Sequence, residues 1–268
     1  MSKVDLREIA KETVEIVRQG HYNLGNQIVQ LNNVEKGRLY TSVDLDSIDI
    51  SRNKEFNNTT LEVINEGTVD AVFRLDMGNI GVLNFASAYH PGGGFLQGAK
   101  AQEECLAFCS NLYETLKDNE FYEIHSKIKS KMYSDSMIVG NVEFFRDSNL
   151  TFVSKPKTVK VVTSAAVNMG QVILKGEDTE VAKQVMKNRM RKVLKLFIKE
   201  DCETVVLGAF GCGVFANNPE DVATNWVDLL LHEGYYKYFK HIVFSIYDKP
   251  NVEGNFAVFK RIIGSRFK

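Results

Sequence analysis

The chain has 268 residues, of which 44% are hydrophobic and 25% are charged, and its formal net charge is −1. These values are typical of a globular protein with a substantial core, and the lack of a basic excess argues against a protein that binds nucleic acid directly through its phosphates. No apolar run reaches the ~20 residues of a membrane helix, the N-terminal segment is too charged for a signal peptide, and four cysteines are too few for a disulfide framework, so we expect a cytoplasmic protein without membrane contact.

The first part of the chain predicts one helix and a long connection. Apolar residues recur at helical spacing from Val4 to Gln19, which predicts a packing helix that Ser2 caps and Gly20 ends. Residues 32–59 are polar and weakly periodic, so we expect a connecting region with at most a short hairpin. Residues 1–59 are therefore interpreted as an N-terminal helix and connecting extension packed on the core.

From residue 60 to residue 268, strand patterns alternate with helix patterns and predict the core. The predicted strands are 60–64, 80–86, 136–146, 158–166, 204–210 and 241–247, with a kink at Lys155–Pro156 between two of them. The predicted helices are 68–77, 103–117, 119–132, a long one that Asp178 caps, 219–231 and 256–264. Such alternation predicts an α/β fold with a mostly parallel or mixed sheet between helices.

A glycine triplet, Gly92–Gly94, follows the strand 80–86, and Gln102, Glu103 and Glu104 then begin a helix. Glycine lets the backbone approach a ligand closely, and the start of a helix favours anions. A glutamate in this position can also simply stabilise the first helical turn. Because consecutive helical residues point about 100° apart, the two carboxylates have different roles if they act. We interpret this stretch as a site.

A second glycine loop, Gly211-Cys212-Gly213-Val214-Phe215, follows the strand 204–210 and leads into a helix that Asn218 can cap. A strand, a glycine loop and a helix N-terminus bind phosphate through backbone N–H groups, although this loop alone is as consistent with a tight turn. Ligands of open α/β sheets lie outside the carboxyl ends of the strands. We therefore expect both loops, and the strand end at 165–170, to border one crevice.

Other polar residues leave alternatives open. Asn84 lies inside a strand, where a buried amide must be paired, and its partner is equally a backbone group or a sugar hydroxyl. Cys105 and Cys109 have no neighbouring histidine to complete a zinc site, so we expect core cysteines, no metal and no cofactor. Cys212 has no obvious His–Asp partner for a nucleophile, and His90 is expected to have a loop role.

Two of these motifs together resemble microbial-type poly(ADP-ribose) glycohydrolases: VLNFASAYHPGGGFLQGAKAQEECLAFCSNLY (82–113) and LGAFGCGVFANNPEDVA (207–223). The segment VVTSAAVNMG (161–170) is similar to a third, and His90 departs from the residue more often found there. The resemblance runs from about residue 60 to the end. It implies a macrodomain-like mixed sheet sandwiched between helices, with an N-terminal helical extension, that binds ADP-ribose over the strand ends.

The resemblance also implies an activity, hydrolysis of the ribose–ribose O-glycosidic bonds of ADP-ribose polymer, free or attached to proteins, to release ADP-ribose. It assigns Glu104 as general acid, with assistance from the substrate diphosphate, and Glu103 as the residue that positions ribose hydroxyls. Phe215 is expected on the nucleoside side and Asn84 at the distal ribose. The implied ligand-binding residues are Asn84, Gly92, Gly93, Gly94, Gln102, Gly211, Cys212, Gly213, Val214 and Phe215.

Two alternatives use the same loops: an ADP-ribose reader without turnover, and a hydrolase that removes mono-ADP-ribose from proteins. The two glutamates favour an enzyme over a reader, and a dinucleotide-binding dehydrogenase is disfavoured because its acidic fingerprint residue is missing. One requirement follows for the enzyme. A general acid at neutral pH needs a raised pKa, so burial or the adjacent Glu103 must outweigh the helix dipole at Glu104.

Overall fold

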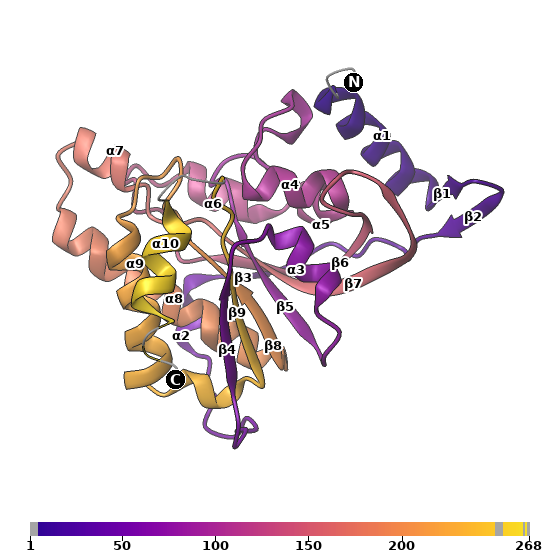
Figure 1. Ribbon diagram of the computed structural model, residues 1–268. Helices are drawn as coiled ribbons and strands as arrows, with labels where there is room; N and C mark the ends of the chain where they lie inside the picture. The colour runs from indigo at the N-terminus through magenta and orange to yellow at the C-terminus, as the bar shows by residue number, and fades with distance from the viewer. Residues whose placement is uncertain (1–4, 250–253, 265, 267–268) are drawn as a thin grey trace.

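A seven-stranded mixed sheet with helices on both faces forms the centre of the molecule (Figure 1). The computed structural model describes residues 5–249, 254–264 and 266. The strand order is β3-β6-β7-β5-β8-β9-β4, in which β7, β5, β8, β9 and β4 are parallel to their neighbours and β6 and β3 are antiparallel. The carboxyl ends of five strands therefore meet at one edge, as the alternating pattern predicted.

The strands are β1 (His21–Leu24), β2 (Gln27–Gln30), β3 (Arg38–Tyr40), β4 (Thr60–Ile64), β5 (Ile80–Phe85), β6 (Met137–Arg146), β7 (Phe152–Ser164), β8 (Thr204–Leu207) and β9 (His241–Ser245). The α-helices are α1 (Leu6–Gln19), α2 (Ser42–Asp46), α3 (Thr68–Arg74), α4 (Gln102–Cys109), α5 (Leu112–Leu116), α6 (Glu120–Ser126), α7 (Met169–Leu174), α8 (Thr179–Lys199), α9 (Pro219–Val227) and α10 (Asn255–Ile262). Short helical turns lie at η1 (Phe95–Gln97), η2 (Asp228–His232) and η3 (Tyr235–Tyr238). Among the helices of the described residues, none combines the length and apolarity that crossing a membrane requires.

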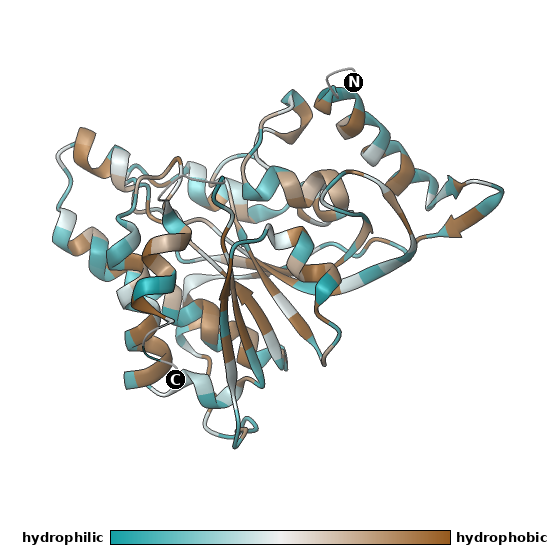
Figure 2. Ribbon diagram, in the orientation of Figure 1, coloured by the Kyte–Doolittle hydropathy of each residue, from teal (hydrophilic) through white to brown (hydrophobic). Residues whose placement is uncertain are grey.

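The sheet separates two apolar layers because side chains alternate along each strand. On β5, Leu83 packs into the layer formed with α2, α8, α9 and α10, whereas Val82 packs into the layer formed with α3, α4, α5 and α6. The central strands are correspondingly hydrophobic along most of their length in Figure 2. Asp178 caps the longest helix, α8, through two backbone N–H groups, as predicted.

The N-terminal helix differs at its start from the prediction. It begins at Leu6, and the Asp5 carboxylate caps it by accepting from Arg7 N at 3.0 Å. The predicted cap, Ser2, lies outside the described residues. The predicted stop is confirmed, because Gly20 adopts a left-handed conformation with φ of 75° and its N–H donates to Ile16 O.

A hairpin that was not predicted precedes the connecting region of residues 32–59. It is formed by β1 and β2, which are joined at Gly25 and Asn26, and Gly25 has the positive φ of 60° that a two-residue hairpin turn requires. Within residues 32–59, β3 pairs with β6 as the edge of the main sheet. Part of the predicted extension thus belongs to the sheet, whereas the division of the chain at residue 59 stays a prediction.

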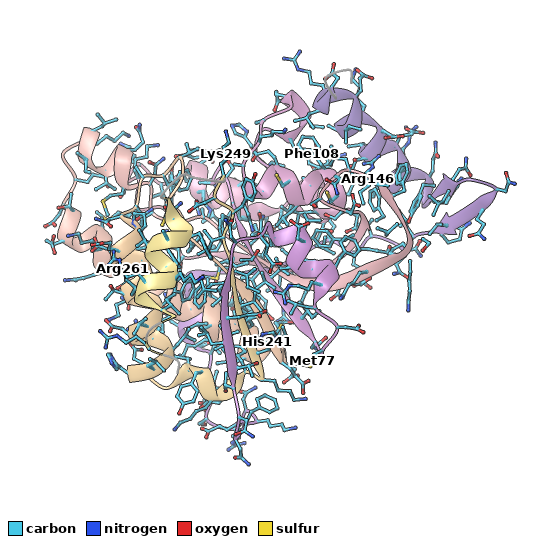
Figure 3. All side chains as sticks on the ribbon, in the orientation of Figure 1. Met77, Phe108, Arg146, His241, Lys249 and Arg261 are labelled. Atoms are coloured by element: carbon cyan, nitrogen blue, oxygen red, sulfur yellow. The ribbon has the colours of Figure 1, made fainter. Side chains whose placement is uncertain are left out.

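Helix α1 is fixed to the core by the buried side chain of Arg146 on β6 (Figure 3). The Arg146 guanidinium donates to Phe108 O at 3.0 Å, to Glu12 Oε2 at 2.5 Å and to the hydroxyl of Thr13. Thr13 and Glu12 belong to α1, and Phe108 lies near the end of α4. A buried guanidinium is tolerated only when its donors are paired, so this contact joins α1, α4 and the sheet.

The predicted helix 103–117 is wrong, because it is divided into α4 and α5. Ser110 is extended, with φ of −149° and ψ of −179°, and forms a bridge with Phe144 of β6. Asn111 then accepts from Glu143 N at 2.9 Å through its side chain. These long-range contacts compete with helical bonds at the break. The prediction of two core cysteines holds for Cys109, which is buried, and is wrong for Cys105, which is exposed.

The predicted kink at Lys155–Pro156 is also wrong, since β7 continues from Phe152 to Ser164. The β6–β7 register shifts between the pairs Phe144–Lys157 and Arg146–Phe152. Pro156 lies within this irregular stretch, where the missing N–H of proline removes no regular ladder bond. The sheet therefore absorbs the proline without ending the strand.

Candidate active site

A cavity of about 740 Å³ opens at the carboxyl ends of β5, β7 and β8, between the two glycine loops. Nine of the predicted site residues line it: Gly93, Gly94, Gln102, Glu103, Glu104, Gly211, Gly213, Val214 and Phe215. The lining residues do not include Asn84, Gly92 or Cys212. Ala166, from the third predicted strand end, does line the cavity. The structure thus brings both loops to one crevice, as predicted.

Glu104 lies in the first turn of α4 with its carboxylate held by two backbone groups. Its Oε1 accepts from Gly94 N at 2.8 Å, and its Oε2 accepts from Ala101 N at 2.8 Å. The side chain is 7% exposed and faces the cavity. Both bonds orient the carboxylate, one towards the glycine triplet and one towards the start of its own helix.

Glu103 is more deeply enclosed, with 3% of its surface exposed. Its Oε2 accepts from Ser87 N at 2.7 Å, and its Oε1 accepts from Asn84 Nδ2 at 3.2 Å. Burial raises the pKa of Glu103 to about 8, against the lowering effect of these hydrogen bonds and with a further rise from the charge of Glu104. The mechanism that the resemblance implies asks for a raised pKa at Glu104, whereas the pKa that burial raises here is that of its neighbour Glu103.

Asn84 supports Glu103 from behind the cavity wall. It is fully buried, and its Nδ2 donates to Glu103 and to Thr163 Oγ1 at 3.2 Å each. Its Oδ1 is buried and has no hydrogen-bond partner in the described part of the chain. The partners of the Asn84 amide are therefore side chains rather than the backbone group that the sequence left open. The contact of Asn84 with a ribose stays a prediction.

Gln102 joins the start of α4 to the end of β5. Its Oε1 accepts from Phe85 N at 2.9 Å, and its Nε2 donates to Leu83 O at 2.8 Å. These two bonds continue the hydrogen bonding of the strand through a side chain. The three consecutive residues Gln102, Glu103 and Glu104 thus bind three different backbone segments, which fixes the direction of each carboxylate.

The glycine triplet makes room for the carboxylates. Gly93 has a φ of +61°, and a Cβ atom there would lie 2.3 Å from Glu104 Oε1 and 3.1 Å from Glu103 Oε2. Any other residue at this position would displace Glu104. Two backbone N–H groups of the triplet have different roles. Gly94 N holds the Glu104 carboxylate, and Gly93 N closes the turn by donating to His90 O at 2.9 Å.

The second loop is arranged differently, because most of its backbone N–H groups point to no protein acceptor. Among the described residues, the N–H groups of Gly211, Gly213, Val214 and Phe215 have no hydrogen-bond partner. The N–H of Cys212, in contrast, donates to Ala209 O at 3.1 Å. Unpaired amides in a loop that leads to a helix form a binding site for an anion. Burial also raises the pKa of the Cys212 thiol to about 12, so that it is a poor nucleophile.

The side chains of the cavity wall leave the loop amides as the donors for an anion. The lining residues of the cavity among the described part of the chain include Glu103, Glu104 and one histidine, His90, and no lysine or arginine. An anionic ligand would therefore be held by amides, as the near-neutral net charge suggested. No group of three or more His, Cys, Asp or Glu side chains in the described parts of the chain is arranged to hold a metal ion.

Sequence reasoning missed Ser87, which organises the first loop. Its backbone N–H donates to Glu103, and its Oγ accepts from Tyr89 N and His90 N at 3.2 Å each. A serine that accepts from the N–H groups two and three residues later is a common turn motif, so a local signal was present. The neighbouring His90 lies on the cavity wall, which the expected loop role did not include.

Comparison with known proteins gives a consistent result. Residues 10–147 match the family model described as microbial-type PARG, catalytic domain. A search of curated proteins gives no match. Three solved structures illustrate the similarity of the whole fold.

The poly(ADP-ribose) glycohydrolase of Thermomonospora curvata is 36% identical, with a TM-score of 0.90 over 96% of this chain and 99% of that chain. The same enzyme bound to the inhibitor ADP-HPD has a TM-score of 0.87 at 36% identity, over 96% of this chain and 98% of that chain. The enzyme of Deinococcus radiodurans in complex with ADP-ribose is 34% identical, with a TM-score of 0.79 over 86% of this chain and 95% of that chain.

Proposed function

We propose a function from one premise: the chain belongs to the microbial-type poly(ADP-ribose) glycohydrolase family. Its reaction is hydrolysis of the ribose–ribose O-glycosidic bonds of ADP-ribose polymer, free or attached to proteins, with release of ADP-ribose. One observation carries the proposal. A single cavity is lined by a loop of unpaired amides and by two carboxylates held in fixed directions.

The loop amides bind the diphosphate of the ADP-ribose unit. Gly213, Val214 and Phe215 offer three consecutive N–H groups without a protein partner among the described residues, and consecutive backbone N–H groups suit a phosphate. Phe215 lines the cavity and packs against both apolar layers, so its ring gives a rigid wall for the nucleoside side. The cavity lining, as far as the structure describes it, contains no lysine or arginine, so the backbone amides are the donors for the phosphates.

The carboxylates act on the glycosidic bond. Glu104 donates a proton to the ribose oxygen that leaves, while the C–O bond breaks and positive charge develops on the anomeric carbon. The substrate diphosphate, folded back towards that carbon, stabilises the charge. Water then attacks the anomeric carbon and gives a proton to the Glu104 carboxylate, which restores the acid. Glu103 holds the ribose hydroxyls.

The two glutamates have different roles in the proton chemistry of the site. In the free protein the pKa of about 8 keeps a proton on Glu103 at neutral pH. A bound diphosphate adds negative charge to the cavity, and like charges raise the pKa of neighbouring carboxyl groups. The bound diphosphate therefore helps to keep Glu103 protonated, while Glu104 delivers the proton to the leaving oxygen.

The cytoplasm is the proposed location of this activity. The support is chemical, since all four cysteines are free thiols, and free thiols are typical of a reducing compartment.

The direct test is incubation of the protein with ADP-ribose polymer and chromatographic detection of ADP-ribose. Release of ADP-ribose by the wild type and its loss in Glu104→Gln would support the proposal. Binding of ADP-ribose without release would instead identify a reader. Release from a mono-ADP-ribosylated protein, with the polymer left intact, would identify a hydrolase of protein-linked ADP-ribose.

A further inference from the structure

A chain of aromatic side chains connects the two loops outside the cavity itself. The rings of His90 and Tyr89 lie 6.5 Å apart, those of Tyr89 and Tyr133 lie 5.6 Å apart, and those of Tyr133 and Phe215 lie 6.0 Å apart. His90 and Phe215, at the two ends, line the cavity, whereas Tyr89 and Tyr133 do not. The two ends of the aromatic chain, His90 and Phe215, therefore lie at the ADP-ribose cavity, and its middle, Tyr89 and Tyr133, lies beside the cavity.

A lysine lies on the middle of this chain. Lys131 Nζ donates to the Tyr89 hydroxyl at 2.8 Å and lies 5.2 Å from the ring centre of Tyr89 and 5.8 Å from that of Tyr133. The hydrogen bond raises the pKa of Lys131, so the ammonium stays charged. An ammonium has three N–H donors, and two of them have no acceptor among the described residues. The nearby carboxylate of Glu177 is occupied by Ser130 Oγ and Lys131 N.

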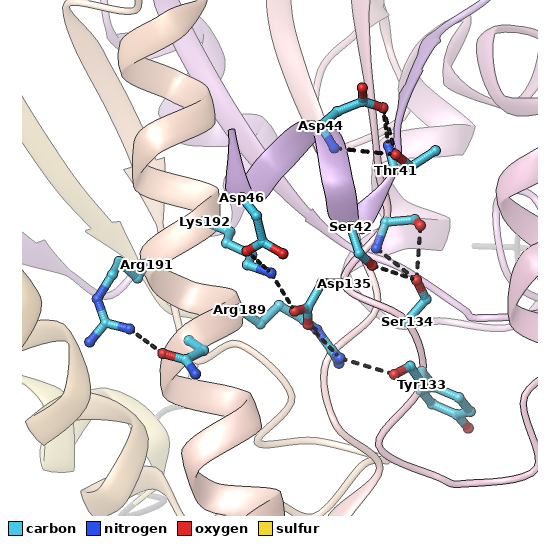
Figure 4. A network of polar contacts seen from close by, with 12 residues as sticks. Thr41, Ser42, Asp44, Asp46, Tyr133, Ser134, Asp135, Arg189, Arg191 and Lys192 are labelled. Atoms are coloured by element: carbon cyan, nitrogen blue, oxygen red, sulfur yellow. Dashed lines mark hydrogen bonds and ion pairs between the residues drawn. The ribbon is translucent and has the colours of Figure 1, made fainter. Parts of the chain in front are cut away.

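Tyr133, at one end of the cluster, is held in place by side chains of α8 (Figure 4). Arg189 of α8, which is fully buried, donates to Tyr133 O at 3.4 Å and pairs with Asp135 at 2.9 Å. Lys192 pairs with the same carboxylate at 2.8 Å. These contacts hold Tyr133 in a backbone conformation with φ of 58°, which is unfavourable for a bulky residue. The geometry of Tyr133 is thus fixed before any ligand binds.

Aromatic rings beside an ammonium with unused N–H donors are suited to bind a nucleotide. Bases stack on aromatic side chains without strong sequence preference, and a lysine with unused N–H donors binds phosphate as a point charge. Each unit of ADP-ribose polymer contains both an adenine and a diphosphate. Because the cluster adjoins the cavity at His90, a polymer that leaves the cavity past His90 meets Tyr89 and Lys131 next.

We propose that Tyr89, Lys131 and Tyr133 form a second subsite, which binds the ADP-ribose unit adjoining the one in the cavity. Tyr89 provides the stacking surface, Lys131 binds the diphosphate and Tyr133 supports both. The inference rests on the proposed function, since it requires ADP-ribose in the cavity. With this subsite, the protein binds two consecutive units of the polymer at once.

The test uses Glu104→Gln as the parent, so that ligands are not cleaved, and compares affinities for ADP-ribose and for its dimer by calorimetry at two salt concentrations. The dimer is expected to bind more tightly than ADP-ribose to the parent. Tyr89→Ala is expected to weaken dimer binding by roughly 5- to 100-fold, the effect of one stacked base. Lys131→Gln is expected to weaken it several-fold and to lower the salt dependence by about one ion contact. ADP-ribose affinity is expected to stay within about twofold in both variants.

Two further variants provide controls. Tyr89→Phe keeps the ring and removes the hydroxyl, so dimer binding should be weakened less than in Tyr89→Ala. Lys240→Gln removes an ammonium at the opposite, amino end of β9, where it pairs with Glu203, and should change neither affinity.

Three results would overturn the inference, each in a distinguishable way. Equal affinities of the parent for ADP-ribose and its dimer would mean that no second subsite exists. Equal losses for both ligands in Lys131→Gln would place the lysine in the ADP-ribose site. A parent that binds neither ligand would remove the proposed function and, with it, this inference.

Discussion

The Glu104 carboxylate accepts a hydrogen bond of 2.8 Å from the backbone N–H of Gly94. This bond joins the start of α4 to the glycine triplet. The second oxygen of the carboxylate accepts from Ala101 N, just before the first turn of α4. The triplet and the Gln-Glu-Glu segment therefore form one structural unit. Its purpose is to hold two buried carboxylates at a cavity whose opposite loop offers free amides.

The first prediction concerns the role of Glu104. Glu104→Gln keeps the shape of the side chain but cannot deliver a proton, so turnover on ADP-ribose polymer should fall by roughly 10²–10⁴-fold, the usual contribution of general acid catalysis. Affinity for ADP-ribose should stay nearly unchanged in calorimetry. Wild-type turnover in this variant would place the acid elsewhere, and equal losses of affinity and rate would make Glu104 a binding residue.

The second prediction concerns pH and Glu103. The pKa is about 8 in the folded protein and 4.5 for the unperturbed group, so the folded state binds the extra proton between these values. Stability should therefore fall as the pH rises from about 5 to 8, because the unfolded state releases this proton first. Glu103→Gln removes this dependence, and its stability relative to the wild type should rise by roughly 2–4 kcal/mol over that range.

Urea denaturation at several pH values checks the second prediction. The comparison uses the slope against pH, because the lost hydrogen bonds of Glu103→Gln add a constant offset. Parallel pH profiles for the two proteins would show that Glu103 ionises normally in the folded state.

The third prediction concerns the room that Gly93 leaves. Gly93→Ala places a Cβ atom 2.3 Å from Glu104 Oε1 at a φ of +61°, so the carboxylate must move. Turnover should fall by at least 10-fold, since small misplacements of catalytic groups are costly. Gly170→Ala is the control, because its Cβ atom would make ordinary contacts of 3.5 Å or longer. Equal activity of the two variants would contradict the tight fit at Gly93.

The fourth prediction tests the amide loop. A Cβ atom at Gly213 meets no protein atom within 4 Å, so Gly213→Ala should fold with unchanged stability. If the diphosphate approaches this backbone closely, the added methyl group should weaken ADP-ribose binding by about 10-fold or more. Calorimetry with ADP-ribose measures the effect. Unchanged affinity would show that the diphosphate lies against another part of the loop.

The fifth prediction concerns the buried network of Figure 4. Arg189→Met leaves Asp135 and the carbonyls of Ala165 and Tyr133 without this partner, so stability should fall by about 3–5 kcal/mol. Arg191→Met on the same helix removes a more exposed pair with Glu233 and should cost less than about 1 kcal/mol. Urea denaturation of both variants makes the comparison. Similar losses in the two would mean that burial of Arg189 contributes little.

Much of the fold and site could be predicted from local patterns. The strand at 80–86, the glycine triplet, the acidic start of α4 and the second loop are each encoded by neighbouring residues, through glycine conformations and helix starts. The meeting of both loops at one edge followed from the parallel order of the strands. Asp178 and Gly20 marked a helix start and a helix end because caps are local.

Contacts between distant residues decided the rest. Ser110 and Asn111 break a helical pattern because β6 offers them partners, and Asn84 finds its partner in Glu103. The role implied for Glu104 asked for a raised pKa there, whereas burial by the segments that pack around α4 raises the pKa of Glu103 instead. The two glycine loops use their amides differently. An amide of the first loop holds a carboxylate, whereas most amides of the second have no acceptor among the described residues, because the folded chain places a carboxylate within reach of the first loop only.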